Sequence, residues 1–219
     1  MRKYDYSVSF IRMIGMMMVI ACHVFQQISP IMGRFSDTSQ RIGDYCANGV
    51  QIFLLVSGYL YAQKEEYFIK AKSRIGFVIR NFKKILIEYW CYCILVIFPV
   101  YAFLEPESIG GSTVLAVLTT AKTVWGVHHL WFIPYILVCY LITPFLFDLK
   151  MYLTKSNKKI FIPGFALLIF LIEWLSYWFE SYFVAEWICV YCIGFFIPEL
   201  IKEIKYRGGG IHPSQYVYV

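Results

Sequence analysis

The sequence predicts an all-α fold, a polytopic transmembrane bundle of about six helices. Of its 219 residues, 59% are hydrophobic and only 16% are charged, a balance much more apolar than that of ordinary globular domains. Several apolar stretches approach or reach the roughly 20 residues that a helix needs to cross a hydrocarbon core of about 30 Å. These stretches are continuous rather than alternating, and they therefore indicate helices and not the strands of a barrel.

Six spans are expected along the chain. The basic start "MRKYDYSV" is typical of a signal peptide, but the apolar run after it is too long and no small-x-small cleavage site precedes a soluble domain. We therefore expect the first span to stay in the membrane. The spans cover about residues 9–29, 47–62 (a short one), 85–104, 130–148, 160–179 and 183–201.

The distribution of positive charge predicts the orientation. Sixteen lysines and arginines fall before the first span or in the segments after spans 2, 4 and 6, whereas only Arg34, Arg41 and Lys122 lie in the alternate segments. Segments rich in Lys and Arg stay in the cytoplasm. Both termini are therefore expected to be cytoplasmic, with residues 1–201 forming one transmembrane domain and residues 202–219 a short, disordered tail.

Two of the connecting segments are long. Residues 62–84 are basic and amphipathic, as expected of a helix at the lipid surface. The outer segment 105–128 is semi-apolar and contains Pro106, Gly110 and Gly111. It is expected either to dip back into the membrane or to rest on it.

The first span, "FIRMIGMMMVIACHVF", contains two ionisable residues, Arg12 and His23. Eleven residues at 100° each bring them to within about 20° of one face of a helix, about 16 Å apart along its axis. Ionisable groups inside a membrane are costly and usually face a cavity. The alternative is that Arg12 extends to the headgroups and His23 bonds a neighbouring carbonyl.

Four sequence blocks occur in the order found in a known family. They are "RMIGMMMVIACH", an R-x10-H motif, followed by "NGVQIFLLVSGYL", "RNFKKIL" and "HHLWFIPYILVCYLITPFL". Over about residues 5–200 the chain resembles the acyltransferase 3 family of integral membrane O-acyltransferases. The resemblance implies transfer of an acyl group, commonly acetyl, from cytoplasmic acyl-CoA to hydroxyls of cell-surface or extracellular polysaccharides.

The resemblance also implies roles for particular residues. His23 would be the catalytic histidine, and Arg12 the arginine of the same motif. Arg80 and Lys83 would match a basic R-x-x-R-type pair, although lysine lacks the bidentate fork of the second arginine. Imidazole exchanges a proton readily near neutral pH, which suits a general base, and cations such as Arg80, Lys83 and Lys84 suit the phosphates of acyl-CoA.

Further candidate substrate-binding residues each have a plain structural alternative. Ser57 lies beside Gly58 in "LLVSGYL", where small residues often serve helix packing instead. His128 and His129 would meet the acceptor, and the adjacent Trp131 also fits an interfacial aromatic belt. Glu173, Tyr177 and Glu180 form a polar stripe on one helix face, and Glu173 would orient His23 or bind a sugar hydroxyl.

The preferred function is thus an O-acyltransferase of the plasma membrane, with acyl-CoA, a carbohydrate acceptor and the bilayer as partners, and no nucleic acid. No permanently bound cofactor and no metal site are expected, because the four histidines lack a ligand constellation and the Cys189–Cys192 pair stands alone. A transporter or flippase is the alternative, although no inverted repeat supports it. The family typically has about ten helices, so a C-terminally truncated, inactive acyltransferase fragment is a further alternative. Association into a homo-oligomer would be one way to replace the missing helices.

Overall fold

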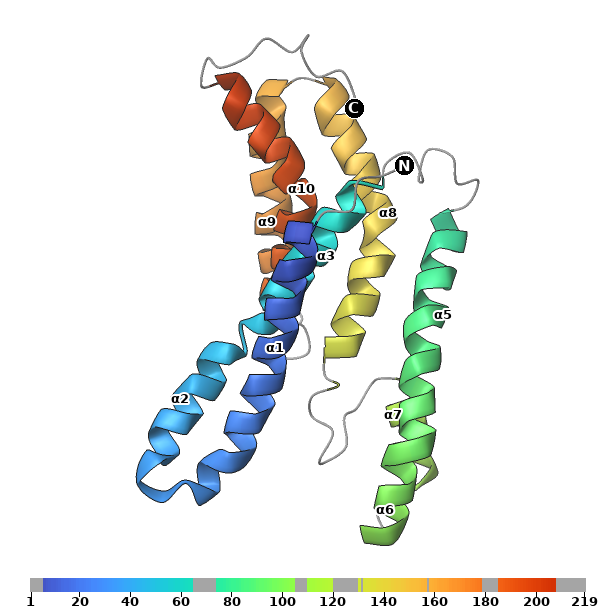
Figure 1. The fold of residues 1–219 in the computed structure, drawn as a ribbon. Helices are drawn as coiled ribbons and strands as arrows, with labels where there is room; N and C mark the ends of the chain where they lie inside the picture. Colours follow the sequence, from blue (N-terminus) through green and yellow to red (C-terminus); the bar gives the residue numbers. More distant parts are fainter. Residues whose placement is uncertain are drawn as a thin grey trace. The chain divides into compact units, whose positions relative to one another are not determined.

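The computed structural model describes residues 6–64, 74–104, 110–119, 130, 132–156, 158–178 and 185–207. All regular structure within these ranges is helical, which confirms the predicted all-α class (Figure 1). The chain divides into two compact units, one formed by residues 1–66 and 145–219 and the other by residues 67–144. The boundary falls inside α8 (Phe132–Ser156), directly after Pro144.

The first unit begins with a helical hairpin. Helix α1 (Tyr6–Ile28) is followed by two short 3-10 turns and by α2 (Ser36–Cys46), which folds back along the C-terminal half of α1 (Figure 1). The second turn begins at Gly33, whose φ of 52° lies in the left-handed region that favours glycine. No apolar stretch in the sequence predicts α2, because most of its residues are polar.

Helix α2 is held against α1 by polar contacts rather than by a large apolar face. The Ser39 hydroxyl donates to the carbonyl of Phe25 over 3.1 Å, and the Ser29 hydroxyl donates to the carbonyl of Ser36 over 3.0 Å. These bonds satisfy hydroxyl groups that are otherwise costly to bury. The side of α2 turned away from α1 is exposed and polar, with Asp37, Gln40, Arg41 and Asp44.

Helix α3 (Gly49–Ala62) continues after α2 and packs on the N-terminal half of α1. The two helices approach closely at Gly15 and Gly49, since a Cβ added to Gly15 would lie 3.1 Å from the Gly49 carbonyl oxygen. Small residues at such crossings let helix backbones come together. The crossing fixes which part of α3 lies beside Arg12.

The core of the first unit lies where α3 meets α10 (Ala185–Arg207). Tyr191, Phe195 and Phe196 of α10 are fully buried, and the rings of Phe195 and Phe196 pack at 5.5 Å. The ring of Phe147, from the part of α8 in this unit, meets Phe195 edge-on at 4.9 Å. Edge-to-face aromatic pairs of this kind add to the stabilisation from burial alone. Helix α9 (Lys158–Trp178) also lies against α10.

The second unit is organised around α5 (Arg74–Tyr92), which continues through a π-helical turn at Cys93–Ile97 into α6 (Phe98–Leu104). Its apolar core joins α5 to α7 (Gly111–Leu118) and to the start of α8, with Tyr89, Cys93, Ile97, Val117, Ile133 and Leu137 buried. The Tyr89 hydroxyl donates to the carbonyl of Val117, and Trp90 Nε1 donates to the carbonyl of Leu118. Side chains of α5 thus cap the C-terminal carbonyls of α7.

Helix boundaries differ clearly from the predicted spans in α5, α8 and α10. Helix α8 continues to Ser156, past the predicted end of its span at residue 148. Helix α5 begins at Arg74, so residues 74–84 form its first three turns and not a separate surface helix; residues 65–73 lie outside the described ranges. Helix α10 extends to Arg207, past the expected start of the tail at residue 202. Good helix formers, among them Glu199 and Lys202 in an i,i+3 ion pair at 3.0 Å, sustain that extension.

Two helical segments in the described part of the chain are long and apolar enough to cross a membrane, Tyr6–Ile31 and Phe132–Thr154. Ile162–Trp174 is a shorter apolar helix. The number of spans and the cytoplasmic placement of both termini remain predictions.

Candidate functional site

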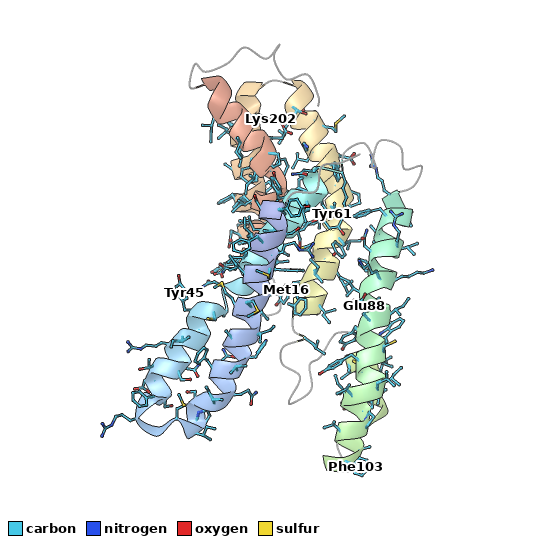
Figure 2. The ribbon with its side chains drawn as sticks, in the orientation of Figure 1. Met16, Tyr45, Tyr61, Glu88, Phe103 and Lys202 are labelled. Carbon is cyan, nitrogen blue, oxygen red and sulfur yellow. The ribbon has the colours of Figure 1, made fainter. Side chains whose placement is uncertain are left out.

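Arg12 and His23 both lie on α1, which is one continuous helix between them. Met16, labelled in Figure 2, marks the intervening part of this helix. Helix geometry therefore places the two ionisable side chains on one face, about 16 Å apart along the axis. The structure thus shows the single helix that the spacing argument requires.

His23 is half-buried, at the part of α1 that α2 covers. Its neighbour Cys22 is buried, and Gly43 of α2 packs there so closely that an added Cβ would lie 3.4 Å from the Cys22 carbonyl oxygen and 3.1 Å from Gln26 Cγ. Helix α2 therefore reaches the turn of α1 that carries His23. A group bound at the imidazole would be next to this hairpin.

Arg12 is exposed, and its guanidinium lies over the ring of Phe53 on α3, 5.5 Å from the ring centroid. This distance is within the range of a cation–π contact. Within the described part of the chain, the Phe53 ring is the partner of the Arg12 guanidinium. Sequence spacing offers no signal for Phe53, because spacing relates residues on one helix and Phe53 belongs to another.

The second unit carries the other predicted cations. Arg80, Lys83 and Lys84 are exposed on α5, and at 100° per residue they share a face about 100° wide. On the opposite side of the same helix, Ile85 and Tyr89 belong to the apolar core. Helix α5 is therefore amphipathic. Its apolar face packs into the core, and this leaves its basic face exposed.

The remaining candidates are dispersed. Ser57 is buried in α3, next to the close contact of Gly58 with α10, which fits a packing role. Glu173 on α9 accepts a hydrogen bond from the Cys189 thiol of α10 over 3.5 Å. That thiol, and not His23, is the partner the structure gives to Glu173.

Four predicted residues lie outside the described ranges, namely His128, His129, Trp131 and Glu180. Among the residues that the structure describes, no group of three or more His, Cys, Asp or Glu side chains is arranged to hold a metal ion. The described candidates are therefore one imidazole, cations on α1 and α5, and polar side chains on α3 and α9.

Comparison with known families decides the assignment. The model of an acyltransferase domain, that of the acyltransferase 3 family, matches residues 5–208. The chain belongs to the acyltransferase 3 family. The match includes the whole of α1 with Arg12 and His23, and it confirms the resemblance seen in the four sequence blocks.

Membership of the acyltransferase 3 family supports acyltransferase activity and association with a membrane, in agreement with the two apolar helices. No curated protein and no solved structure matches the chain.

Proposed function

We propose that this protein is a multi-pass O-acyltransferase of the plasma membrane. It would move an acyl group, preferentially acetyl, from cytoplasmic acyl-CoA to a hydroxyl of a cell-surface or extracellular polysaccharide. Family membership supports acyl transfer. The observation that carries the proposal furthest is the position of Arg12 and His23 on one face of the apolar helix α1, because ionisable groups in such a helix usually serve a polar path.

His23 is the proposed general base. Its imidazole accepts the proton of the acceptor hydroxyl as that oxygen attacks the carbonyl carbon of the thioester. A carbon–oxygen bond forms, the carbon–sulfur bond breaks, and the proton on the imidazole passes to the departing thiolate of CoA. The half-buried setting of His23 beside α2 supports this role, since partial exclusion of water favours a defined proton transfer.

Arg12 is the proposed contact for the donor within the membrane. Its distance of about 16 Å from His23 along α1 is comparable to an extended pantetheine arm. The thioester would then reach His23 while the nucleotide stays at the cytoplasmic mouth. Arg80, Lys83 and Lys84 would bind the phosphates of acyl-CoA, because exposed cations on one helix face form charge-assisted hydrogen bonds with phosphate oxygens.

On the acceptor side, the proposal assigns the carbohydrate to histidine, tryptophan and glutamate side chains. His128, His129 and Trp131 would contact the carbohydrate, and Glu173 would bind one of its hydroxyls. The Glu173 carboxylate accepts a hydrogen bond from the Cys189 thiol, which supports its proposed role as an acceptor for a sugar hydroxyl. Ser57 is buried in helix packing, so we assign it the smallest contribution to substrate binding.

The first test is acetyl-CoA-dependent O-acetylation of polysaccharide in membranes that contain this chain. His23→Ala should lower the rate by about 10²–10⁴-fold, the usual contribution of a general base. The matched control is Met17→Ala, which truncates an exposed side chain on the same helix and should keep the activity. Amounts of each variant in the membrane are measured in parallel.

Two results would contradict the proposal. Activity of His23→Ala equal to that of the unchanged protein would remove the imidazole from the reaction. An equal loss in Met17→Ala and His23→Ala would mean that the helix, and not the imidazole, is sensitive to substitution.

A further inference from the structure

The contact between Arg12 and Phe53 joins two blocks that are far apart in the sequence. Arg12 belongs to the R-x10-H motif on α1, and Phe53 lies within "NGVQIFLLVSGYL" on α3. The guanidinium carbon is 5.5 Å from the centroid of the Phe53 ring. Both residues lie in the same compact unit of the chain, so the contact is internal to one packed body.

The helix crossing explains why an aromatic ring is available at this point. Helices α1 and α3 come closest at Gly15 and Gly49, where little side-chain volume separates their backbones. Phe53 follows Gly49 by four residues and is therefore one turn further along the same face of α3. Arg12 precedes Gly15 by three residues on α1. The two side chains thus meet one turn beyond the crossing.

The chemistry of the pair favours orientation of the arginine. The face of an aromatic ring attracts a cation, and a guanidinium is planar with its N–H donors around its edge. A guanidinium that rests on a ring face keeps those donors available. An exposed arginine without such a support samples many rotamers, and fixing it on binding costs conformational entropy.

We propose that Phe53 is a positioning residue for Arg12. Its ring holds the guanidinium in the orientation that receives a phosphate or carbonyl oxygen of the acyl-CoA donor. This inference rests on the donor-binding role of Arg12 given under Proposed function. It adds a residue from α3 to the R-x10-H motif, which lies wholly on α1, and it makes the α1–α3 crossing part of donor recognition.

The test compares four variants of the full chain in lipid nanodiscs, with acetyl-CoA as the probe. The first measurement is the dissociation constant for acetyl-CoA, followed by KM and kcat for transfer. Phe53→Leu keeps an apolar side chain but removes the ring, and it should weaken acetyl-CoA binding by about two- to thirtyfold, the range of a cation–π contact. Phe53→Tyr keeps the ring and should bind acetyl-CoA about as tightly as the unchanged protein does. Arg12→Ala should weaken binding by about tenfold or more.

The fourth variant is the control Phe35→Leu, which removes an exposed aromatic ring from the turn between α1 and α2. It should bind acetyl-CoA as the unchanged protein does. A positioning role further predicts that KM rises in Phe53→Leu while kcat stays nearly constant. A merely structural role would instead be expressed as loss of folded protein, followed in parallel by thermal unfolding.

A double-mutant comparison separates positioning from packing. In an Arg12→Ala background, Phe53→Leu should have no further effect on acetyl-CoA affinity, because the group that it orients is absent. Additive losses would overturn the inference.

The outcomes also separate this inference from the proposed function. If Arg12→Ala weakens acetyl-CoA binding and Phe53→Leu does not, the positioning role is wrong and the donor-binding role of Arg12 stands. If Arg12→Ala leaves the affinity unchanged, the donor-binding role itself is wrong and the inference falls with it.

Discussion

Lys150 on α8 forms an ion pair with Glu199 on α10, with Nζ and Oε1 3.3 Å apart and with side chains only 5% and 13% exposed. Lys150 also donates to the carbonyl of Ala62 at the end of α3 over 3.4 Å. The ammonium group therefore connects three helices of the first unit. Glu199 has a second partner in Lys202, labelled in Figure 2, whose side chain is 71% exposed.

This arrangement predicts unequal effects of removing either partner. Glu199→Gln removes the carboxylate that pairs with the buried ammonium of Lys150 and should destabilise the protein by about 3–5 kcal/mol. Lys150→Met should cost less, because Glu199 keeps Lys202 and the new side chain is apolar. Thermal unfolding of the purified variants in detergent measures both effects.

Lys202→Ala is the control for this ion pair. It removes only an exposed partner and should change the stability by less than about 1 kcal/mol. The prediction is wrong if Glu199→Gln unfolds at the same temperature as the unchanged protein, or if Lys202→Ala is the more damaging substitution.

A second prediction concerns the contact of α3 with α10 at Gly58 and Gly194. A Cβ added to Gly58 would lie 2.8 Å from the backbone nitrogen of Phe195, and one added to Gly194 would lie 2.7 Å from the carbonyl carbon of Leu55. Backbone atoms cannot move aside as a flexible side chain does. Gly58→Ala and Gly194→Ala should therefore each destabilise the first unit by about 1–3 kcal/mol or more, as overpacking does.

Two other glycines serve as controls for these effects on stability. Gly111→Ala should have almost no effect on unfolding, because nothing lies within 4 Å of an added Cβ there. Gly164→Ala should be mild, since its nearest neighbour is the methyl end of the Leu153 side chain. Equal unfolding temperatures for Gly194→Ala and Gly111→Ala would show that the helices separate at little cost.

The helices were predictable from sequence where apolar stretches are long, and less so elsewhere. The stretch around Arg12 and His23 predicts α1 well, because a run of apolar residues has few alternatives to a helix in a membrane. Helix α2 was not predictable, because its contacts with α1 use the hydroxyls of Ser29 and Ser39 rather than apolar periodicity. Such tertiary hydrogen bonds leave no local pattern.

The candidate site was predictable in part for the same reason. The shared face of Arg12 and His23 follows from spacing on one helix, and the basic face of α5 follows from Arg80, Lys83 and Lys84. Contacts between helices were not predictable, as the ring of Phe53 under Arg12 and the thiol of Cys189 at Glu173 illustrate. Their partners are far apart in the sequence, and only the packing of the first unit brings them together.

The basic face of α5 leads to a third prediction about donor binding. Arg80, Lys83 and Lys84 are exposed, and exposed charges act through a field that salt screens. Removing Lys83 and Lys84 together should raise KM for acetyl-CoA by several-fold, with little change in kcat. The dependence of KM on ionic strength should also become shallower, because fewer charges on the protein respond to salt.

Lys83→Arg tests whether geometry as well as charge matters on this face. The planar fork of arginine makes two parallel bonds to a phosphate, whereas lysine acts as a point charge, so Lys83→Arg should lower KM for acetyl-CoA below that of the unchanged protein. Arg74→Ala, which removes one exposed charge about 120° around the same helix from Arg80, is the matched control and should leave KM near its original value. A KM that rises as much in Arg74→Ala as in Lys83→Ala would mean that α5 attracts the donor by total charge alone. A KM unchanged in the double variant Lys83→Ala/Lys84→Ala would remove this face from donor binding.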